Sequence, residues 1–547
     1  DGLAIRNMLQ ISGVDGRPVR SFMNSWIFCH NNPDYRRRYF AYLEEVYKTG
    51  IDGIMTDDIQ FVSGPLKDGE DFDINSCVCP HCRRLFRERT GFELPQPGEE
   101  WQQFQRERDS VRFMEWKHFR RESTMKFFGD VDAHYLSRGL DMLRPNYAAT
   151  AVSWHSPWAY AVSELPVLDW IFVEHCCGFL RYSWPEFLVE SVYVMMLSRQ
   201  RKIPGSALYY PARLPEQRFA WALSLYSGLH YMGDQRYEDL FPEQKEFHIF
   251  EKDHFAHLFE CSEIAHAALF DSVRSRDAQE DYNSTVRFRF NSIAQACIMN
   301  NVPLAIVRPE YADEYGDFQL VIVPGTVYLS DEQIVDLGRN SRKLLWCDNA
   351  GTRRMNGTPR SEEEILALLG VSEFGGRVQR LECGELAAPF YRRCRADGEG
   401  NRDAFNCSEP ERWRLWNEAE KAASRALAGR IASLLDRPFY RIEAAPENLL
   451  ISAFNCDDGA ISLRLVNAVA TLQPPSQAGY GADDPVEFPA LTEDVRIILQ
   501  MPRVARVKYA AFPDINGELE FRCDGTQTEI ILPAGILTEF MLIVVEK

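Results

Sequence analysis

The sequence lacks any apolar run long enough to cross a membrane. No stretch of about 18 uninterrupted apolar residues occurs in the 547-residue chain, so we expect no membrane-spanning helix. The opening residues, DGLAIRN, lack the basic and apolar regions of a secretory signal. Basic residues are also few: 61 Lys and Arg stand against 80 Asp and Glu, a formal charge of -19. This balance argues against nucleic acid as the main partner, because phosphate binding requires a basic surface.

A cysteine pattern typical of a disulfide framework is missing as well. The chain has 14 cysteines, but Cys176 and Cys177 are adjacent and others stand alone in apolar stretches. This distribution is typical of reduced thiols with one metal site, and it favours a cytoplasmic location. The hydrophobic content of 45% suffices for large cores. The length predicts two to four domains, at roughly 150 residues each.

The stretch 50–82, GIDGIMTDDIQFVSGPLKDGEDFDINSCVCPHC, carries most of the recognisable chemistry. Its apolar run 51–56 ends on two adjacent carboxylates, Asp57 and Asp58. A buried strand that delivers acids to one edge of a sheet has this pattern. We therefore expect the loop after this strand to carry both candidate catalytic acids and, further along the chain, a candidate metal site.

Three cysteines follow in that loop with Cys-x-Cys-x-x-Cys spacing, at Cys77, Cys79 and Cys82. Thiolates at this spacing suit tetrahedral zinc, which needs one further Cys or His. Three residues could supply the fourth ligand: Cys29, His30 or His81. No position in the motif is open for water, so we expect the zinc to fix the loop and take no part in catalysis.

Residues 1–262 alternate short apolar runs with longer amphipathic stretches. The strand candidates are 3–10, 51–56, 147–153, 170–173, 207–210 and 228–231. A helix is predicted over 33–50, with Pro33 in its first turn and Gly50 at its end. Strand and helix repeating in one order predict a parallel sheet, and polar and aromatic residues after the strands favour a (β/α)8 TIM barrel. Six strands are recognisable, so we expect that the barrel is N-terminally incomplete, or that two strands are too short to recognise.

Two further domains are predicted after the barrel. Residues 263–440 alternate helix and strand as an open α/β domain of the flavodoxin kind, with a buried strand at 321–323 and a turn at Pro324-Gly325. That domain has no glycine-rich phosphate loop, so a subunit contact is favoured over a ligand site. Residues 441–547 predict a small antiparallel β-sandwich. Its hairpin signals are Asp458-Gly459, Asn516-Gly517 and Asp524-Gly525.

Together these segments resemble the family 42 β-galactosidases and their relatives. The resemblance rests on DGIMTDD, CVCPHCRRLFRERTG and DFQLVIVPGTVYLSDEQI, followed by the terminal sandwich. It implies a barrel that hydrolyses glycosides with retention, a middle domain that builds a homotrimer, and zinc held by four cysteines. Three of these match Cys77, Cys79 and Cys82, and the upstream fourth matches Cys29.

The catalytic positions depart from that family. Its acid/base is the Glu of an Asn-Glu pair, where this chain has Asp57-Asp58. Its nucleophile is a Glu late in the barrel, and the matching strand here, SALYYPA, has no carboxylate. The resemblance therefore does not carry the β-galactosidase activity over, and the carboxylates must be found from the residues.

Glycosidic bonds are usually cleaved by two carboxylates. The strand DWIFVEH places Glu174 at a strand end, two strands after Asp57. Strands two apart lie roughly 10 Å from each other, and inward side chains can close this gap to the roughly 5 to 9.5 Å that the two mechanisms need. We therefore predict Asp57 or Asp58 together with Glu174 as the catalytic pair, and Asp234 as a third candidate.

Each carboxylate also has a structural interpretation. The two aspartates could cap a loop or form salt bridges. Glu174 could be a buried partner of Arg144 or Arg181. Asp234 could be a turn residue.

Sugar sites combine aromatic faces with polar side chains that bind hydroxyl groups. The predicted substrate-binding residues are Trp26, Asn31, Asn146, Trp154, His155, His175, Tyr209, Tyr210, His230 and Asp234. Any one of them is more often a core residue than a subsite. Their position after strands, at the predicted carboxyl-terminal rim of the barrel, is the stronger argument.

The sequence thus predicts a zinc-stabilised glycoside hydrolase that acts on a carbohydrate as a trimer. A metal-dependent barrel hydrolase is one alternative, against which stands the lack of a His-x-His cluster. A non-catalytic carbohydrate-binding relative is the other, because the late Glu is missing.

Overall fold

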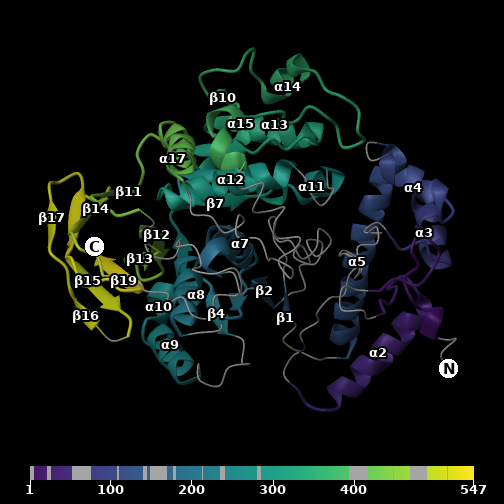
Figure 1. The fold of residues 1–547 in the computed structure, drawn as a ribbon, viewed down its shortest axis with the longest axis horizontal. Coiled ribbons are helices and arrows are strands. Elements are labelled where there is room, and N and C mark those ends of the chain that lie inside the picture. Colours follow the sequence, from purple (N-terminus) through teal and green to yellow (C-terminus); the bar gives the residue numbers. More distant parts are fainter. Residues whose placement is uncertain are drawn as a thin grey trace.

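The fold is that of a computed structural model of the 547-residue chain. The structure describes residues 5–20, 26–51, 54, 76–107, 110–138, 145–147, 169–175, 180–211, 214–233, 241–279, 285–392, 417–447, 449–468, 490–513 and 515–547. Helices from the N-terminal part lie at one side and antiparallel strands from the C-terminal part at the other (Figure 1). Among the described residues, none of the helices has the length and apolarity that a membrane span requires.

The N-terminal part is helical. Its helices are α2 (Pro33–Tyr47), α3 (Pro80–Thr90), α4 (Glu99–Arg106) and α5 (Val111–Ser137). Asn32 caps α2 by accepting hydrogen bonds from the backbone N–H groups of the next turn, and Gly50 follows the helix with a φ of 74°. The predicted helix over 33–50 is therefore confirmed at its start, but it ends at Tyr47, with Lys48 and not Gly50 as its C-cap.

The strand predicted over 3–10 is wrong for its described residues. Met8 and Leu9 donate their N–H groups to Ile5 and Arg6 in local turns, which use the backbone groups of a strand ladder. Only an isolated bridge between Leu9 and Phe28 is formed.

A parallel four-stranded sheet follows. Its strands, in spatial order, are β1 (Pro145–Tyr147), β2 (Trp170–His175), β3 (Gly205–Tyr209) and β4 (His230–Gly233). The helices between and after them are α7 (Leu180–Arg201), α8 (Leu214–Tyr226), α9 (Phe241–Asp253) and α10 (Phe255–Leu258). The predictions over 170–173, 207–210 and 228–231 are confirmed, and 147–153 overlaps β1 at Tyr147. The predicted strand 51–56 lies outside the described residues except at positions 51 and 54.

The faces of this sheet differ. Ile171, Val173, Ala207 and Tyr209 are buried in one cluster with side chains of α7 and α8. Side chains alternate along a strand, so Phe172 and its neighbours at even positions lie on the other face. The first face packs in the larger hydrophobic core, and Phe172 on the second face is buried in a separate small cluster.

A second parallel sheet has the strand order β10-β9-β8-β6-β7. Its strands are β6 (Ala267–Phe270), β7 (Leu304–Val307), β8 (Leu320–Val323), β9 (Leu344–Cys347) and β10 (Val378–Leu381). The accompanying helices are α11 (Val273–Gln279), α12 (Thr285–Met299), η2 (Pro309–Asp317), α13 (Asp331–Asn340), α14 (Glu362–Leu369), α15 (Cys383–Leu386) and α17 (Glu418–Ala432). The first strand lies between the second and third, which is the flavodoxin-like order. The strand predicted at 321–323 is confirmed as β8.

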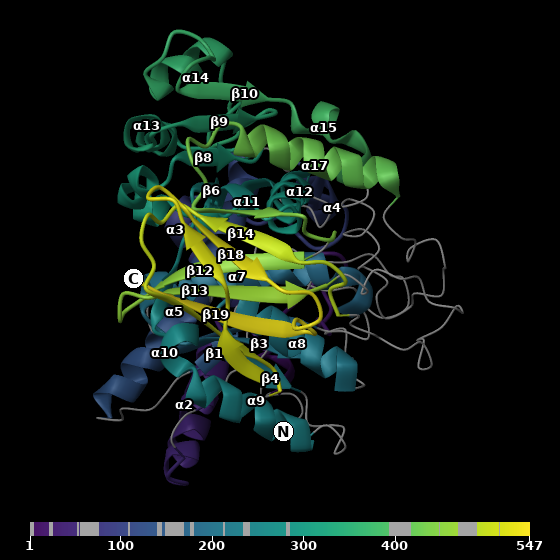
Figure 2. The same cartoon turned by 90° about the vertical axis from the view of Figure 1, so that its left-hand side faces the viewer.

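Two antiparallel sheets form the C-terminal part (Figure 2). Their strands are β5 (Cys261–Glu263), β11 (Tyr440–Glu443), β12 (Leu449–Cys456), β13 (Ile461–Asn467), β14 (Val495–Leu499), β15 (Arg506–Ala511), β16 (Ile515–Glu518), β17 (Phe521–Cys523), β18 (Thr528–Leu532) and β19 (Phe540–Glu546). One sheet has the order β11-β14-β18-β17 and the other β16-β15-β19-β13-β12-β5. The turns predicted at Asp458-Gly459 and Asp524-Gly525 join β12 to β13 and β17 to β18.

The turn predicted at Asn516-Gly517 is wrong. Both residues lie inside β16, and the described turn after β15 is at 512–513. Gly517 pairs with Tyr509, and a Cβ at Gly517 would lie 2.7 Å from a ring carbon of Tyr509. The glycine therefore makes room for an aromatic ring on the neighbouring strand and does not form a turn.

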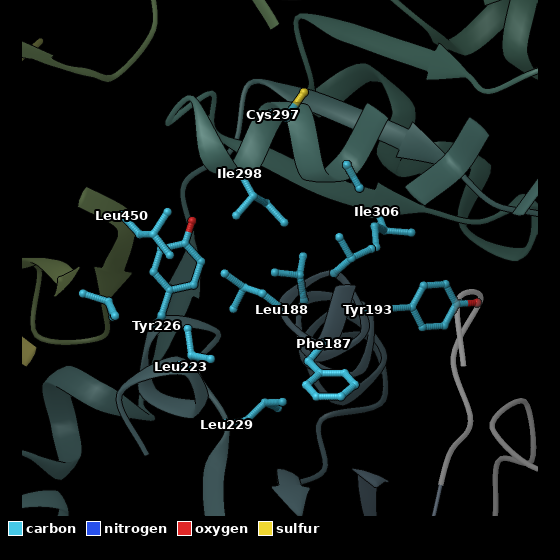
Figure 3. Close-up of a cluster of buried hydrophobic side chains, with 14 of the residues drawn as sticks. Phe187, Leu188, Tyr193, Leu223, Tyr226, Leu229, Cys297, Ile298, Ile306 and Leu450 are labelled. Carbon is cyan, nitrogen blue, oxygen red and sulfur yellow. The ribbon is translucent and has the colours of Figure 1, made fainter. Parts of the chain in front are cut away.

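Helices from the parallel sheets and strands of the antiparallel part share one hydrophobic core. Figure 3 shows side chains of α7, α8, α12, β7 and β12 converging on it. The labelled members are Phe187, Leu188, Tyr193, Leu223, Tyr226, Leu229, Cys297, Ile298, Ile306 and Leu450. Segments distant in sequence thus stabilise one another.

Arg464 of β13 is a fully buried cation in this contact region. Its guanidinium donates to the carbonyls of Leu225 at 2.8 Å and Leu258 at 2.6 Å, near the C-terminal ends of α8 and α10. It also lies 3.6 Å from the ring centroid of Phe454. Carbonyls at helix C-termini lack intrahelical partners and carry partial negative charge, so Arg464 completes two helices with one side chain.

We expect Arg464→Met to lower the free energy of unfolding by roughly 3 kcal/mol, because buried carbonyls lose charged donors. Thermal or urea unfolding followed by circular dichroism measures the change. Arg496→Met is the matched control, since its ion pair with Glu529 spans 3.7 Å at the surface and should contribute less than about 1 kcal/mol. Equal melting of the two variants would contradict the role given to Arg464.

Candidate functional site

Glu174 lies near the carboxyl end of β2, on the sheet face opposite to α7 and α8. It pairs in register with Leu208 of β3, and Tyr210 follows directly after that strand. The Tyr210 hydroxyl donates a hydrogen bond to Oε1 of Glu174. Both side chains are half-buried. Two neighbouring strands thereby hold one carboxylate in a fixed orientation at the edge of the sheet.

Beneath this carboxylate the same face is packed with side chains. Phe172 packs with Leu208, Met232 and Val273, and Val273 is the first residue of α11. One step further down, the indole N–H of Trp170 donates to Ser206 Oγ at 2.9 Å on the next strand. The sheet interior is therefore filled below Glu174, and polar chemistry on this face is concentrated at its carboxyl end.

His175 and Tyr209 point to the opposite face. His175 is fully buried, with Nε2 at 3.0 Å from Ser191 Oγ and Nδ1 at 3.3 Å from Glu190 of α7. Its ring centroid lies 4.6 Å from that of Tyr209, which is also fully buried. These two residues pack the helix side of the sheet and do not line the site of Glu174.

His230 lies at the wrong end of its strand for a rim residue. It is the first residue of β4 and pairs with Ser206, whereas Met232 lies level with Glu174 through Leu208. Its ring stacks on Phe259 at 3.8 Å. The predicted strand 228–231 has His230 near its carboxyl end, but β4 begins two residues later, with His230 as its first residue. A role at the carboxyl-terminal rim is therefore excluded by its position.

Trp26 and Asn31 make their contacts with residues of the N-terminal part. Trp26 is 44% exposed, and the guanidinium of Arg20 lies 4.1 Å from its ring centroid. Asn31 donates through Nδ2 to Cys82 Sγ at 3.4 Å and to Ser123 Oγ at 3.1 Å. Asn31 thus contacts the cysteine cluster, a role that its sequence position beside Cys29 could have suggested.

Several predicted site residues lie outside the described residues. These are Asp57, Asp58, Trp154, His155 and Asp234. Asn146 is described only through the backbone of β1. Of the predicted catalytic residues, the structure therefore describes Glu174.

Four cysteines of the N-terminal part lie close together. The sulfur atoms of Cys29, Cys77, Cys79 and Cys82 lie within 4.8 Å of one another, and all four residues are buried. His30 and His81 do not belong to this group. Instead, the His30 ring stacks on Phe127, and its burial lowers the pKa of His30 to about 3. The predicted cluster is thus complete with Cys29.

Hydrogen-bond donors surround the sulfur atoms. Cys77 Sγ accepts from the backbone N–H of Ile11 at 3.2 Å and of Cys79 at 3.4 Å, and Cys82 accepts from Asn31. Hydrogen bonding with Cys77 raises the pKa of Cys29, and burial raises that of Cys82. Hydrogen bonding with the other cysteines, first with Cys29, lowers the pKa of Cys79. Four sulfurs this close and this buried can hold one metal ion, whose charge would let all four be thiolates.

No protein-family model and no curated protein sequence matches the chain. Solved structures do. An α-L-fucosidase from Paenibacillus thiaminolyticus aligns over 100% of this chain and 86% of its own, with a TM-score of 0.61 and 14% identity. A β-galactosidase from Bacillus circulans sp. alkalophilus covers 98% and 86%, with a TM-score of 0.56 and 11% identity.

An exo-carrageenase of glycoside hydrolase family 42 from Bacteroides ovatus also aligns, over 100% of this chain and 73% of its own. Its TM-score is 0.57 and its identity 9%. Family 42 β-galactosidases are among the other matched structures. The predicted resemblance is thus confirmed at the level of the fold, which this chain shares with these glycoside hydrolases.

We expect the purified protein to contain about one tightly bound metal ion per chain, because four buried cysteines form a closed ligand set. Cys82→Ser should lose the metal and melt at a lower temperature. Cys523→Ser is the control, since Cys523 is exposed and outside the cluster. Elemental analysis of extensively dialysed protein, paired with thermal unfolding, gives both results. A metal-free wild type that is indifferent to chelators would overturn the expectation.

Proposed function

We propose that the protein is a glycoside hydrolase and that Glu174 is one of its two catalytic carboxylates. The observation that carries this proposal is the hydrogen bond from Tyr210 to Glu174 at the carboxyl end of two parallel strands. A catalytic carboxylate must be held in one orientation, and this bond does so. The fold likeness to a fucosidase, β-galactosidases and an exo-carrageenase supports the same class of reaction.

The second carboxylate in this proposal is Asp57 or Asp58. One carboxyl group protonates the departing glycosidic oxygen, and the other attacks the anomeric carbon or activates water. Tyr210 donates a hydrogen bond to Oε1 of Glu174 and thereby orients this carboxylate.

The proposed architecture has three domains: a (β/α)8 barrel over 1–262, a flavodoxin-like domain over 263–440 and a β-sandwich over 441–547. Helices on one side of the parallel sheet β1 to β4 and the shared fold support the barrel. We further propose that the four cysteines hold structural zinc and that the middle domain assembles a trimer. Zinc fits these ligands because structural zinc sites are tetrahedral and often use four cysteines. With four protein ligands, no coordination position is left for substrate or water.

Glu174→Gln should lower kcat/KM on the best aryl glycoside by about 100-fold or more, the size usual for a lost acid, base or nucleophile. Tyr210→Phe should lower it by roughly 10-fold, because the carboxylate loses one orienting hydrogen bond. A panel of α- and β-linked chromogenic glycosides provides the substrate. Tyr209→Phe is the matched control: this neighbouring tyrosine faces the helices.

Added azide separates the roles of the carboxylates. If Glu174 is the nucleophile, Glu174→Ala with azide yields a glycosyl azide of inverted configuration; if it is the acid/base, the azide product keeps the substrate configuration. Wild-type activity in Glu174→Gln would refute the assignment. A wild type that binds a sugar without hydrolysing it would instead favour the carbohydrate-binding alternative.

A further inference from the structure

A second pair of cysteines, Cys261 and Cys456, lies face to face between two antiparallel strands. Cys261 begins β5, Cys456 ends β12, and the two are direct partners in the register of these strands. Residues paired in register point to the same side of a sheet. Neither belongs to the four-cysteine cluster.

The hydrogen-bond pattern places this pair at the closer of the two kinds of cross-strand position. Asp457 donates its N–H to Glu260 at 3.0 Å, and Ile264 donates to Ala453 at 2.8 Å. Hydrogen-bonded pairs alternate with non-hydrogen-bonded ones along an antiparallel ladder, so Cys261 and Cys456 form a non-hydrogen-bonded pair. Such pairs have Cα atoms roughly 4.5 Å apart and the side chains closer, within the range of about 4.4 to 6.8 Å that a disulfide requires.

The surroundings make the two thiols unequal. Cys261 is half-buried and accepts a hydrogen bond from Nη2 of Arg464 at 2.9 Å, whereas Cys456 is 6% exposed. Burial raises the pKa of the Cys261 thiol, and the Arg464 guanidinium partly offsets this increase. Burial raises the pKa of Cys456 to about 12. Cys261 is therefore the thiol that an oxidant meets first, and Cys456 is placed to resolve the product.

We propose that Cys261 and Cys456 are a redox-active pair that forms a reversible disulfide with low-molecular-weight disulfides. The Cys261 thiolate attacks one sulfur of RS–SR, forming a mixed disulfide and releasing one thiol RSH after protonation. The Cys456 thiolate then attacks the Cys261 sulfur, forming the Cys261–Cys456 bond and releasing the second RSH. The two protein thiols are oxidised, one RS–SR is reduced to two RSH, and the two thiol protons go to these products.

This bond would close a covalent ring around the second parallel sheet. The chain leaves β5 for β6, runs through β10 and α17, and returns through β11 to β12. A disulfide between the two strands joins the points where the chain enters and leaves this segment. Because long closed loops restrict the unfolded chain most, the oxidised protein should resist unfolding more than the reduced one.

The test exposes the purified 547-residue protein to oxidised glutathione, blocks the remaining thiols, and maps disulfide-linked peptides by mass spectrometry. We expect a linked peptide pair containing Cys261 and Cys456 that has lost two hydrogens and is restored by dithiothreitol. Non-reducing electrophoresis should show a faster monomer band, and the melting temperature should rise on oxidation. Cys523→Ser should behave like wild type, because Cys523 is exposed and unpaired with either residue.

Cys456→Ser should stop at a glutathione adduct on Cys261, with no linked peptide and no rise in melting temperature. Cys261→Ser should show neither the adduct nor the link. Folding of both variants is checked by circular dichroism before oxidation. The proposal fails if wild type carries only glutathione adducts, or if Cys261 and Cys456 are linked to other cysteines in preference to each other. It also fails if the link forms equally well in urea, since the strand register would then play no part.

Discussion

The alternation of side chains along parallel strands separates the candidate site from the core. In β2, Glu174 and His175 are consecutive, so one reaches the face at which Tyr210 donates to it and the other packs against α7. Tyr210, directly after β3, donates to Glu174, whereas Tyr209 is fully buried in the cluster formed with α7 and α8. A shift of one residue in the register of β2 would bury the carboxylate and expose an imidazole. The strand register therefore decides which of these residues can do chemistry.

Sequence patterns predicted elements well where the signal was local. Pro33 correctly indicated the start of α2, and the strands around Glu174 and Tyr209 lie where apolar runs indicate them. Strand ends were less predictable, and His230 shows the consequence: a start two residues later moves it from the carboxyl end to the amino end of β4. The turn prediction at Gly517 was wrong for another reason: a glycine that contacts an aromatic ring and a glycine in a turn cannot be distinguished in the sequence.

The cysteine cluster shows which metal ligands sequence spacing alone can predict. Cys77, Cys79 and Cys82 are close in sequence, and their spacing predicted the site. The fourth position depended on tertiary contacts that bring Cys29 within 3.5 Å of Cys82, and the sequence left two histidines as alternatives. Asn31 was predicted to bind sugar because it is an Asn in a loop. Its amide instead donates a hydrogen bond to the sulfur of Cys82. Residue type indicates what a side chain can bind, while the contacts decide what it does bind.

The C-terminal strands contribute to the site through the helices. Trp221 of α8 packs at 4.8 Å on Phe512 and at 5.3 Å on Phe540, both from that part of the chain. Arg464 completes the C-terminal end of α8, which in turn packs against β3, the strand that precedes Tyr210. The hydrogen bond on Glu174 thus rests on contacts that begin in the antiparallel sheet. Because a catalytic carboxylate tolerates displacements of only about 0.5 Å, residues without any chemistry of their own can still set its position.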